Sequence, residues 1–222
     1  MDIALLGGTG DIGEGLALRW AYDTDHRVIV GSREPQRARA RARKYETELD
    51  SRGVERTIEG NGNEPAAARA DVVVVAVPPY YVGETVETVA DGLDEDAILV
   101  SPAVGMKRDD DGMHYHRPGA GSVTAVAADA APDGVSTVGA FHSLSADRLA
   151  NLDVALDLNT VVVGDDADAK DVVVDLGNAI EGIRVLDAGP LANAPEVESL
   201  TPLLINLARY NPGLQHAGVT FD

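Results

Sequence analysis

The stretch Asp2-Ile-Ala-Leu-Leu-Gly-Gly-Thr-Gly-Asp-Ile-Gly13 decides the fold of this 222-residue chain. Its first residues are mostly apolar and predict a short buried strand, which ends where the glycines begin. Apolar residues then recur at helical spacing, at Ile12, Leu16 and Trp20. The motif G-x-G-x-x-G, from Gly8 to Gly13, therefore lies between a strand and a helix. Glycines there permit a tight turn and close approach of the backbone to a pyrophosphate, so the sequence predicts a dinucleotide-binding site.

Strand and helix patterns alternate through the rest of the chain. The run Asp71–Val77 is rich in valine and lacks polar alternation, which is typical of a parallel strand covered on both faces. Further strands are predicted at Arg27–Gly31, Ala97–Ser101, Ser136–Phe141, Thr160–Val163 and Arg184–Asp187, and further helices at about Pro35–Leu49, Ala167–Ile180 and Val197–Tyr210. This order predicts an α/β fold with a doubly wound parallel sheet.

Two parts of the chain are less regular. The segment Arg108–Gly121 is charged, rich in glycine and without periodicity, so we expect a loop there. We place a soft domain boundary near residue 146, between a nucleotide-binding domain (1–145) and a smaller C-terminal part (146–222). The strands of the C-terminal part are expected to extend the sheet, and its last helix to cover it.

Charge excludes several classes of partner. The chain has 18 basic and 37 acidic residues and a net charge of −19, so we expect neither nucleic acid nor an anionic membrane as its partner, only small molecules. Only three basic residues are lysines, and aspartate outnumbers glutamate by 24 to 13. This composition resembles that of cytosolic proteins from salt-accumulating halophiles, where salt screens self-repulsion. An ordinary acidic enzyme is the alternative.

The same composition predicts a cytoplasmic protein. The chain has no cysteine, which excludes disulfides and thiolate chemistry. Its longest apolar run, Val72–Val77, is far shorter than the ~20 residues that span a bilayer. The first apolar stretch, Ile3–Leu6, runs into glycines without a basic leader, so we expect no secretory signal.

The end of the second predicted strand indicates which dinucleotide binds. An NAD site usually has an acidic residue there, about 20 residues beyond the motif, to hold the ribose 2′-hydroxyl. Here the strand is followed by Ser32 and Arg33, and Arg37 comes one turn into the next helix. A hydroxyl and two guanidinium groups suit a 2′-phosphate, so the pattern favours NADP. We interpret the basic residues from Arg39 to Lys44 as a solvated helix face.

Several segments match one known family. They are Ile3–Gly10, Gly15–Arg19, Val30–Arg33, Val100–Pro102, Ala150–Asp153, Leu186–Leu191 and Val197–Leu204. Through them nearly the whole chain resembles the archaeal coenzyme F420-dependent NADP reductases, and the last two segments are unlike a generic dinucleotide-binding enzyme. The resemblance implies a Rossmann domain with a smaller C-terminal part, commonly in a homodimer. It also implies reversible hydride transfer between the nicotinamide of NADP(H) and the deazaflavin of F420.

The resemblance further implies which residues meet each coenzyme. The diphosphate is expected at Thr9, Gly10, Asp11 and Ile12; the nicotinamide and its ribose at Val77, Pro79, Gly83, Ala103 and Val104; and the deazaflavin at His142, Ser143, Leu144 and Ala217. Asp11 stands where the family often has a neutral residue, so we expect it to contact the diphosphate through its backbone. Arg37 stands where the family usually has lysine.

The role of His142 has three interpretations. Hydride transfer between two carbons needs no nucleophile and no metal, only carbons held about 3–3.5 Å apart with water excluded. His142 could orient the polar edge of the deazaflavin, transfer a proton, or be a strand-end histidine held by packing; we favour orientation. The run Asp109-Asp110-Asp111 with His114 and His116 has the atoms for a metal site, but the acidic composition accounts for it and we expect no metal.

Two other functions are left open. A non-enzymatic NADP sensor would keep the glycine motif but have no use for the C-terminal segments. A reductase of a small imine or keto acid usually has a catalytic lysine, whereas Lys107 and Lys170 lie in polar contexts. On the last helix, one apolar face is predicted either to pack into the core or to form a dimer seam; it consists of Leu200, Leu203, Leu204 and Leu207.

Overall fold

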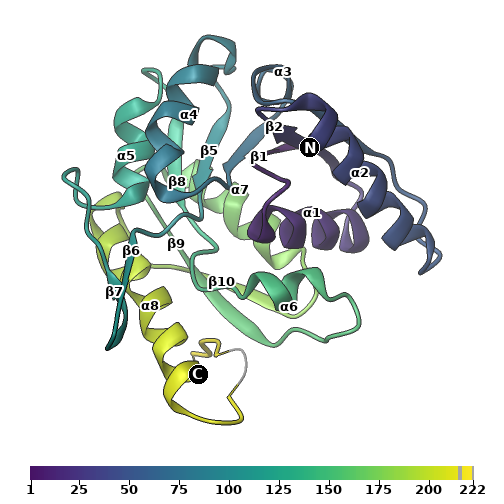
Figure 1. Cartoon of the computed structure of the whole chain (residues 1–222). Helices are drawn as coiled ribbons and strands as arrows, with labels where there is room; N and C mark the ends of the chain where they lie inside the picture. The colour runs from purple at the N-terminus through teal and green to yellow at the C-terminus, as the bar shows by residue number, and fades with distance from the viewer. Residues whose placement is uncertain (215–216, 222) are drawn as a thin grey trace.

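The computed structural model describes residues 1–214 and 217–221. Within this part of the chain, eight strands form one sheet in the order β10-β9-β8-β5-β4-β1-β2-β3 (Figure 1). They are β1 (Asp2–Leu6), β2 (Arg27–Ser32), β3 (Ile58–Gly62), β4 (Val72–Val75), β5 (Ile98–Ser101), β8 (Ser136–Gly139), β9 (Leu158–Gly164) and β10 (Ile183–Asp187). The predicted α/β fold is confirmed, and the C-terminal strands extend the same sheet.

Helices cover both faces of this sheet (Figure 1). One face carries α1 (Asp11–Asp23), α2 (Pro35–Asp50), α6 (Ala146–Ala150) and α7 (Ala167–Asn178). The other carries α3 (Asn63–Ala67), α4 (Val82–Val89) and α5 (Val123–Ala130). The long helix α8 (Ala194–Tyr210) begins against Val161 and Val163 of β9. Short 3₁₀ turns lie at Pro79–Tyr81, Ala90–Gly92 and Leu191–Asn193.

Apolar patterning explains how these layers form. Strand β4 consists of four valines, all fully buried because the two helical layers cover both faces of the strand. Helix α2 buries Ala38, Ala42, Tyr45 and Leu49, which lie on one face at helical spacing. Such burial contributes about 25 cal/mol per Å² of apolar area and is the main stabilising term. Among the described residues, no helix has both the length and the apolar character of a membrane span.

The loop prediction for Arg108–Gly121 was wrong in its first half. The chain forms an antiparallel hairpin there, from β6 (Met106–Asp109) and β7 (Gly112–Tyr115). The Asp109 carboxylate closes the turn by accepting hydrogen bonds from the N–H groups of Asp111 and Gly112. Apolar alternation is missing because the hairpin stands outside the main sheet and leaves most of its side chains exposed or half-buried.

The predicted parallel sheet has one antiparallel junction, between β8 and β9. The other neighbouring strands of the sheet run parallel. After β8 the chain packs α6 against α1, through Leu149 beside Gly15, and enters β9 from the edge at which β8 ended. The strand β3 was not predicted because Ile58–Gly62 contains a single large apolar residue.

Candidate functional site

Backbone packing shows why the glycine motif needs its glycines. A Cβ on Gly8 would lie 2.8 Å from the carbonyl oxygen of Leu5, and one on Gly13 would lie 2.6 Å from the Cα of Gly8. At Gly10 the nearest atom to such a Cβ is a carbonyl oxygen 3.4 Å away, so space there is open. Helix α1 begins at Asp11 with no side-chain cap in the described structure. Its first N–H groups are therefore available to a phosphate.

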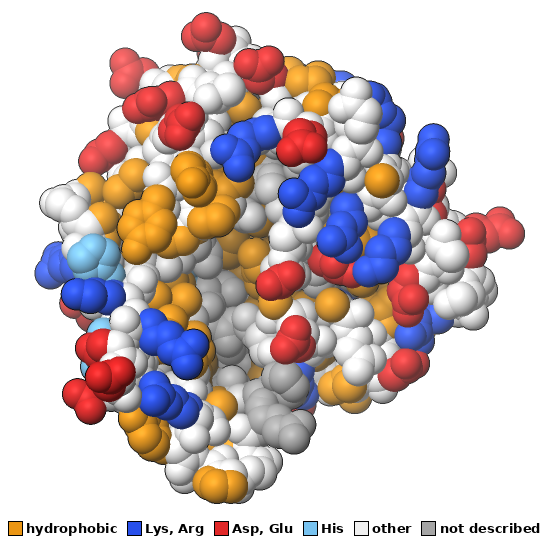
Figure 2. All heavy atoms as spheres, viewed as in Figure 1, with side chains coloured by type: hydrophobic (Ala, Val, Ile, Leu, Met, Phe, Trp, Pro, Cys, Tyr) orange, Lys and Arg blue, Asp and Glu red, His pale blue; other side chains and the backbone are white. Residues whose placement is uncertain are grey.

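A cavity of about 260 Å³ opens beside this motif. Figure 2 shows basic side chains gathered over α2 beside a hollow in the surface. The cavity is lined by Gly7, Thr9, Gly10, Ser32, Arg33, Glu34, Arg37, Asn63, Ala76, Val77, Pro78, Tyr81 and Thr85. The structure thus brings together the glycine motif, the three predicted 2′-phosphate ligands and the residues just beyond β4.

Seven lining residues were not predicted as site residues: Gly7, Glu34, Asn63, Ala76, Pro78, Tyr81 and Thr85. The Tyr81 ring lies against Arg33, whose guanidinium carbon is 5.3 Å from the ring centroid, within the range of a cation–π contact. Glu34 donates its backbone N–H to the Ser32 hydroxyl at 3.1 Å and so orients that hydroxyl. Asn63 opens α3 at the end of β3, and no strand was predicted there. The sequence signal that could have pointed to Tyr81 is the run Pro78-Pro79-Tyr80-Tyr81.

The other residues predicted for NADP are not among those that line this cavity. Gly8, the first glycine of the motif, is buried against Leu5; Asp11, Ile12 and Gly13 form the first turn of α1. Pro79 begins a 3₁₀ turn, and Gly83 faces α5, where a Cβ would lie 3.3 Å from a Val126 methyl carbon. Ala103 and Val104 are buried beyond β5. Contact of these residues with a coenzyme stays a prediction.

A second cavity of about 320 Å³ gathers the residues predicted for the deazaflavin. His142, Ser143 and Leu144, which follow β8, line one side of it. The other lining residues are Ser145, Ala146, Thr201, Leu204, Ile205, Ala208 and Ala217, four of them from α8. Segments far apart in the sequence therefore meet at one predicted site.

Burial makes His142 a neutral residue at pH 7. The residue is only 4% exposed, and burial lowers the pKa of its imidazole to about 4. The preceding Phe141 has a left-handed backbone with φ +68°, which is strained for a side chain of this size and turns the chain sharply after β8. Thr201 of α8 donates its hydroxyl to the His142 carbonyl oxygen at 2.8 Å and holds this turn. An uncharged imidazole favours orientation of a ligand over proton donation at neutral pH.

A buried carboxyl group lies close to this histidine. Glu198 of α8 is fully buried, and burial raises its pKa against the opposing effect of the hydrogen bonds it accepts. Sequence reasoning missed it, since a single glutamate in the stretch Val197-Glu-Ser-Leu200 looks like an ordinary surface position of an amphipathic helix.

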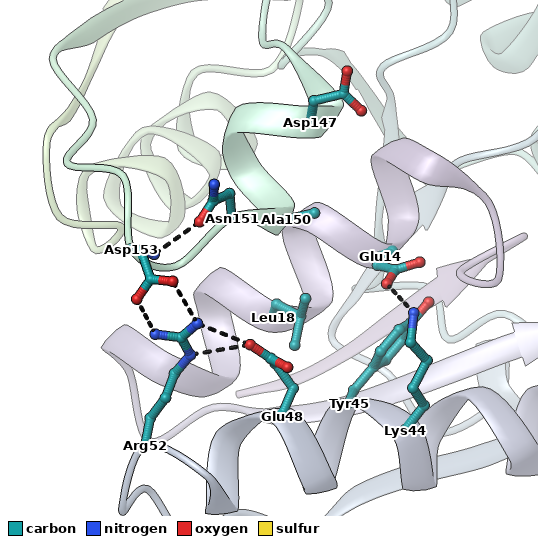
Figure 3. Close-up of a pocket in the computed structure, with 10 residues that line it drawn as sticks. All are labelled: Glu14, Leu18, Lys44, Tyr45, Glu48, Arg52, Asp147, Ala150, Asn151 and Asp153. Atoms are coloured by element: carbon teal, nitrogen blue, oxygen red, sulfur yellow. Dashed lines mark hydrogen bonds and ion pairs between the residues drawn. The ribbon is translucent and has the colours of Figure 1, made fainter.

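A third cavity, of about 400 Å³, lies between α1, α2 and α6 (Figure 3). Its charges are largely paired, because Arg52 bridges Glu48 and Asp153, and Lys44 binds Glu14. Four carboxylates against two cations line it in total: Glu14, Glu48, Asp147 and Asp153 against Lys44 and Arg52. This excess of negative charge disfavours an anionic coenzyme, and the Arg52–Asp153 ion pair connects α2 to the segment that follows α6.

The acidic run Asp109-Asp110-Asp111 forms the end of β6 and the turn of the hairpin. Asp109 pairs with His114 across the hairpin at 3.0 Å, besides closing the turn. Within residues 1–214 and 217–221, no group of three or more potential ligand side chains is placed to hold a metal ion.

Comparison with known proteins identifies the family. Residues 2–105 match the model of the family described as NADP oxidoreductase, coenzyme F420-dependent. The F420-dependent NADP reductase of Methanocaldococcus jannaschii is 37% identical over 209 residues, which cover 93% of this chain and 92% of the relative. The chain belongs to the F420-dependent NADP reductase family. The enzyme of the same name from Methanothermobacter thermautotrophicus is 36% identical over 222 residues, covering 99% of this chain and 94% of that one.

One solved structure agrees with this assignment, and a second shares the fold. A protein from Arthrobacter sp. FB24, provisionally named an F420-dependent NADP reductase, superposes with a TM-score of 0.78 at 25% identity and covers 100% of this chain and 98% of its own. A pyrroline-5-carboxylate reductase from Coxiella burnetii gives a TM-score of 0.56 at 18% identity, covering 83% of this chain and 58% of its own. The second likeness shows the shared fold alone. The resemblance inferred from the sequence is confirmed at the level of the family.

Proposed function

We propose that the protein catalyses reversible hydride transfer between NADP(H) and coenzyme F420. The observation that carries the proposal is that two candidate sites lie at the same edge of the sheet. Strands β1, β2, β4 and β8 run parallel to one another across this part of the sheet. The glycine-motif cavity and the cavity at His142 both lie beyond the carboxyl ends of these strands. Ligands of doubly wound folds gather at that edge.

The chain's own residues would act by binding, orienting and excluding water. Bound NADPH and F420 supply the donor and the acceptor carbon of the hydride. The open space at Gly10 and the free N–H groups of α1 fit a diphosphate, and Arg33 and Arg37 offer charge for a 2′-phosphate. The apolar side chains of Leu144 and Leu204 would keep water from the deazaflavin ring, because the second cavity is walled by them.

We infer a preference for NADP over NAD of at least tenfold in kcat/KM, an order of magnitude that one charge-assisted hydrogen bond accounts for. Ser32, Arg33 and Arg37 support this, since all three line the same cavity. Glu34 also lines it, so one carboxylate shares this cavity with the two arginines.

The central test is a simple absorbance assay. NADPH added to the full-length protein and oxidised F420 should remove the absorbance of the oxidised deazaflavin, and NADP added to reduced F420 should restore it. A non-enzymatic NADP sensor or an imine reductase would leave this absorbance unchanged. The positions of two lysines also argue against an imine or keto acid reductase. Lys170 forms an ion pair with Asp187 at 2.8 Å, and Lys107 lies exposed on the hairpin.

The placement of F420 has a separate test. Ala217 lines the second cavity, so removal of the chain after Gly213 should abolish F420 reduction while NADPH binding stays nearly intact. NADPH titration by protein fluorescence, together with circular dichroism, shows whether the truncated protein is folded. Reduction at a near wild-type rate by the truncated protein would contradict the placement.

We further propose a homodimer in the cytoplasm of a salt-accumulating cell. On α8, Leu204 is buried, whereas Leu203 and Leu207 are 53% and 41% exposed and form an apolar surface for a second copy. The net charge of −19 supports the halophilic assignment. We keep the functional division at residue 146, with residues 146–222 completing the F420 site although they share the sheet. Light scattering should report twice the chain's mass, and a monomer would contradict the dimer.

A further inference from the structure

The fully buried carboxylate of Glu198 connects three elements of the fold. It projects from α8 toward the first turn of α5 and toward Tyr115 of β7. Four donors converge on its two oxygens: the Tyr115 hydroxyl at 2.9 Å, the N–H groups of Val123 at 3.1 Å and Thr124 at 2.9 Å, and the Thr124 hydroxyl at 3.1 Å. A carboxylate that accepts this many hydrogen bonds is held in one orientation.

The Thr124 hydroxyl stands between this carboxylate and His142. Its oxygen is 3.1 Å from Glu198 Oε1 and 3.4 Å from His142 Nε2. A hydroxyl has only one hydrogen to donate, and a hydrogen bond to a charged acceptor is about twice as strong as one to a neutral acceptor. The hydrogen is therefore committed to Glu198, and the Thr124 oxygen faces the imidazole as an acceptor.

Close packing supports this arrangement. A Cβ on Gly139, at the end of β8, would lie 2.8 Å from the Thr124 hydroxyl oxygen. The glycine therefore leaves the space that Thr124 occupies between the carboxylate and the ring. The same Cβ would lie 2.9 Å from a methyl carbon of Val163, which pairs with Gly139 across the antiparallel junction, so Thr124 and Val163 together require a glycine at this position.

We infer that Glu198 and Thr124 are positioning residues that fix His142 as the Nε2–H tautomer, so that its unprotonated Nδ1 serves as hydrogen-bond acceptor for the second coenzyme. Nε2 must carry the ring proton because it faces an acceptor. Nδ1 is buried and has no hydrogen-bond partner in the described structure. An unpaired buried acceptor is costly, and a ligand donor that reaches Nδ1 from the cavity lined by His142 would relieve that cost.

The inference names a chemical partner. It rests on the proposed function, because His142 lines the cavity assigned to the deazaflavin. The pyrimidine part of a deazaflavin carries a ring N–H donor between two carbonyl groups. A bare imidazole nitrogen accepts from that N–H, whereas the Nδ1–H tautomer would oppose it with a second donor. Through Thr124, Glu198 thus determines that His142 accepts, rather than donates, the hydrogen bond to the coenzyme.

The tautomer can be measured without any coenzyme. Nitrogen-15 NMR of the full-length protein, with the His142 signals assigned by comparison with a His142→Gln protein, reports which ring nitrogen carries the proton. We expect the proton on Nε2. A proton on Nδ1 overturns the inference, and this result does not depend on whether the protein reduces F420. Failure of the proposed function alone would instead appear as an Nε2–H tautomer in a protein without F420 reduction.

Kinetics test the consequence for binding. Thr124→Val removes the hydroxyl at nearly constant shape and should raise KM for F420 about three- to tenfold, the value of one lost hydrogen bond, with KM for NADPH unchanged. Thr124→Ser should restore KM for F420. The matched control is Thr160→Val, since the Thr160 hydroxyl is also buried but has no partner in the described structure. An unchanged KM for F420 in Thr124→Val, or an equal rise in Thr160→Val, contradicts the inference; if Thr124→Val does not fold, the wild-type tautomer decides.

Discussion

Replacement of Arg33 by alanine should weaken NADP(H) selectively. Arg33 lines the glycine-motif cavity, and no ion pair engages it within the described residues, so its charge is available to a 2′-phosphate. Its guanidinium also rests on the Tyr81 ring, 5.3 Å from the centroid, which restricts the side chain before the ligand arrives.

The magnitude follows from exposure and charge. A hydrogen bond to a charged group contributes about 1.5–3 kcal/mol. Because Arg33 is exposed, we take the lower end of that range, which corresponds to about a tenfold loss of affinity. The rise should appear in KM for NADPH and leave kcat nearly unchanged, since the 2′-phosphate lies far from the reacting carbon. Values for NADH should not change.

Steady-state kinetics with NADPH and NADH, at a fixed F420 concentration, measure the effect. Arg39→Ala is the matched control, because Arg39 is an exposed arginine of α2 that does not line the cavity. The assignment of the 2′-phosphate site is refuted if the NADPH/NADH ratio of kcat/KM is unchanged in Arg33→Ala. It is equally refuted if Arg39→Ala lowers the ratio as much.

Three further predictions concern stability. Gly13→Ala should cost about 1–3 kcal/mol, because the new Cβ would lie 2.6 Å from the Gly8 Cα, whereas Gly119→Ala has nothing within 4 Å and should change stability by less than about 0.5 kcal/mol; urea unfolding compares them. Dilute buffer should lower the thermal midpoint relative to molar KCl, since −19 charges repel over a screening length of ~30 Å at 0.01 M salt, and equal midpoints by circular dichroism would count against halophily. In the folded protein, burial lowers the pKa of His142 to about 4, whereas the ordinary pKa of histidine is ~6.5. Between these two values the unfolded chain binds more protons than the folded one, so stability falls as the pH drops from ~6.5 toward 4. His142→Gln should reduce this loss of folding free energy by up to about 3 kcal/mol. If the urea midpoints of the two proteins change in the same way with pH across that range, the reasoning is wrong.

The core of the fold could be predicted because its signals are local. The strand Asp2–Leu6 and the helix beginning at Pro35 have the predicted bounds or differ by a residue, since apolar period and turn chemistry act within a few residues. The run after Asp71 was also recognised, although the strand itself is the shorter Val72–Val75. These elements place the glycine motif at the sheet edge.

Elements that depend on distant partners could not be predicted. The hairpin Met106–Tyr115 has polar strands, and it is held by contacts with α8, such as the hydrogen bonds between Asn206 and the backbone of Met113. The antiparallel step into β9 likewise follows from where α6 packs, which no local pattern encodes.

In the candidate site, too, residues with a local sequence signal could be predicted, and those that depend on distant partners could not. Ser32, Arg33 and Arg37, which line one cavity with the glycine motif, could be selected from the sequence because they follow a strand at a fixed distance from that motif. Glu198 was missed because a buried carboxylate shows itself only through its partners, Tyr115 and Thr124, which lie more than 70 residues away in the sequence. Long-range polar networks of this kind need the structure.

Isotope transfer tests the central claim of direct hydride transfer most directly. NADPH carrying deuterium at the nicotinamide C4, prepared separately on each face, is mixed with the full-length protein and oxidised F420 in ordinary water. We expect one of the two labelled forms to deliver its deuterium to C5 of the reduced deazaflavin, because the proposed sites would hold both rings together at one sheet edge with water excluded. Deuterium lost to water, with solvent hydrogen at C5 from both labelled forms, would contradict the account.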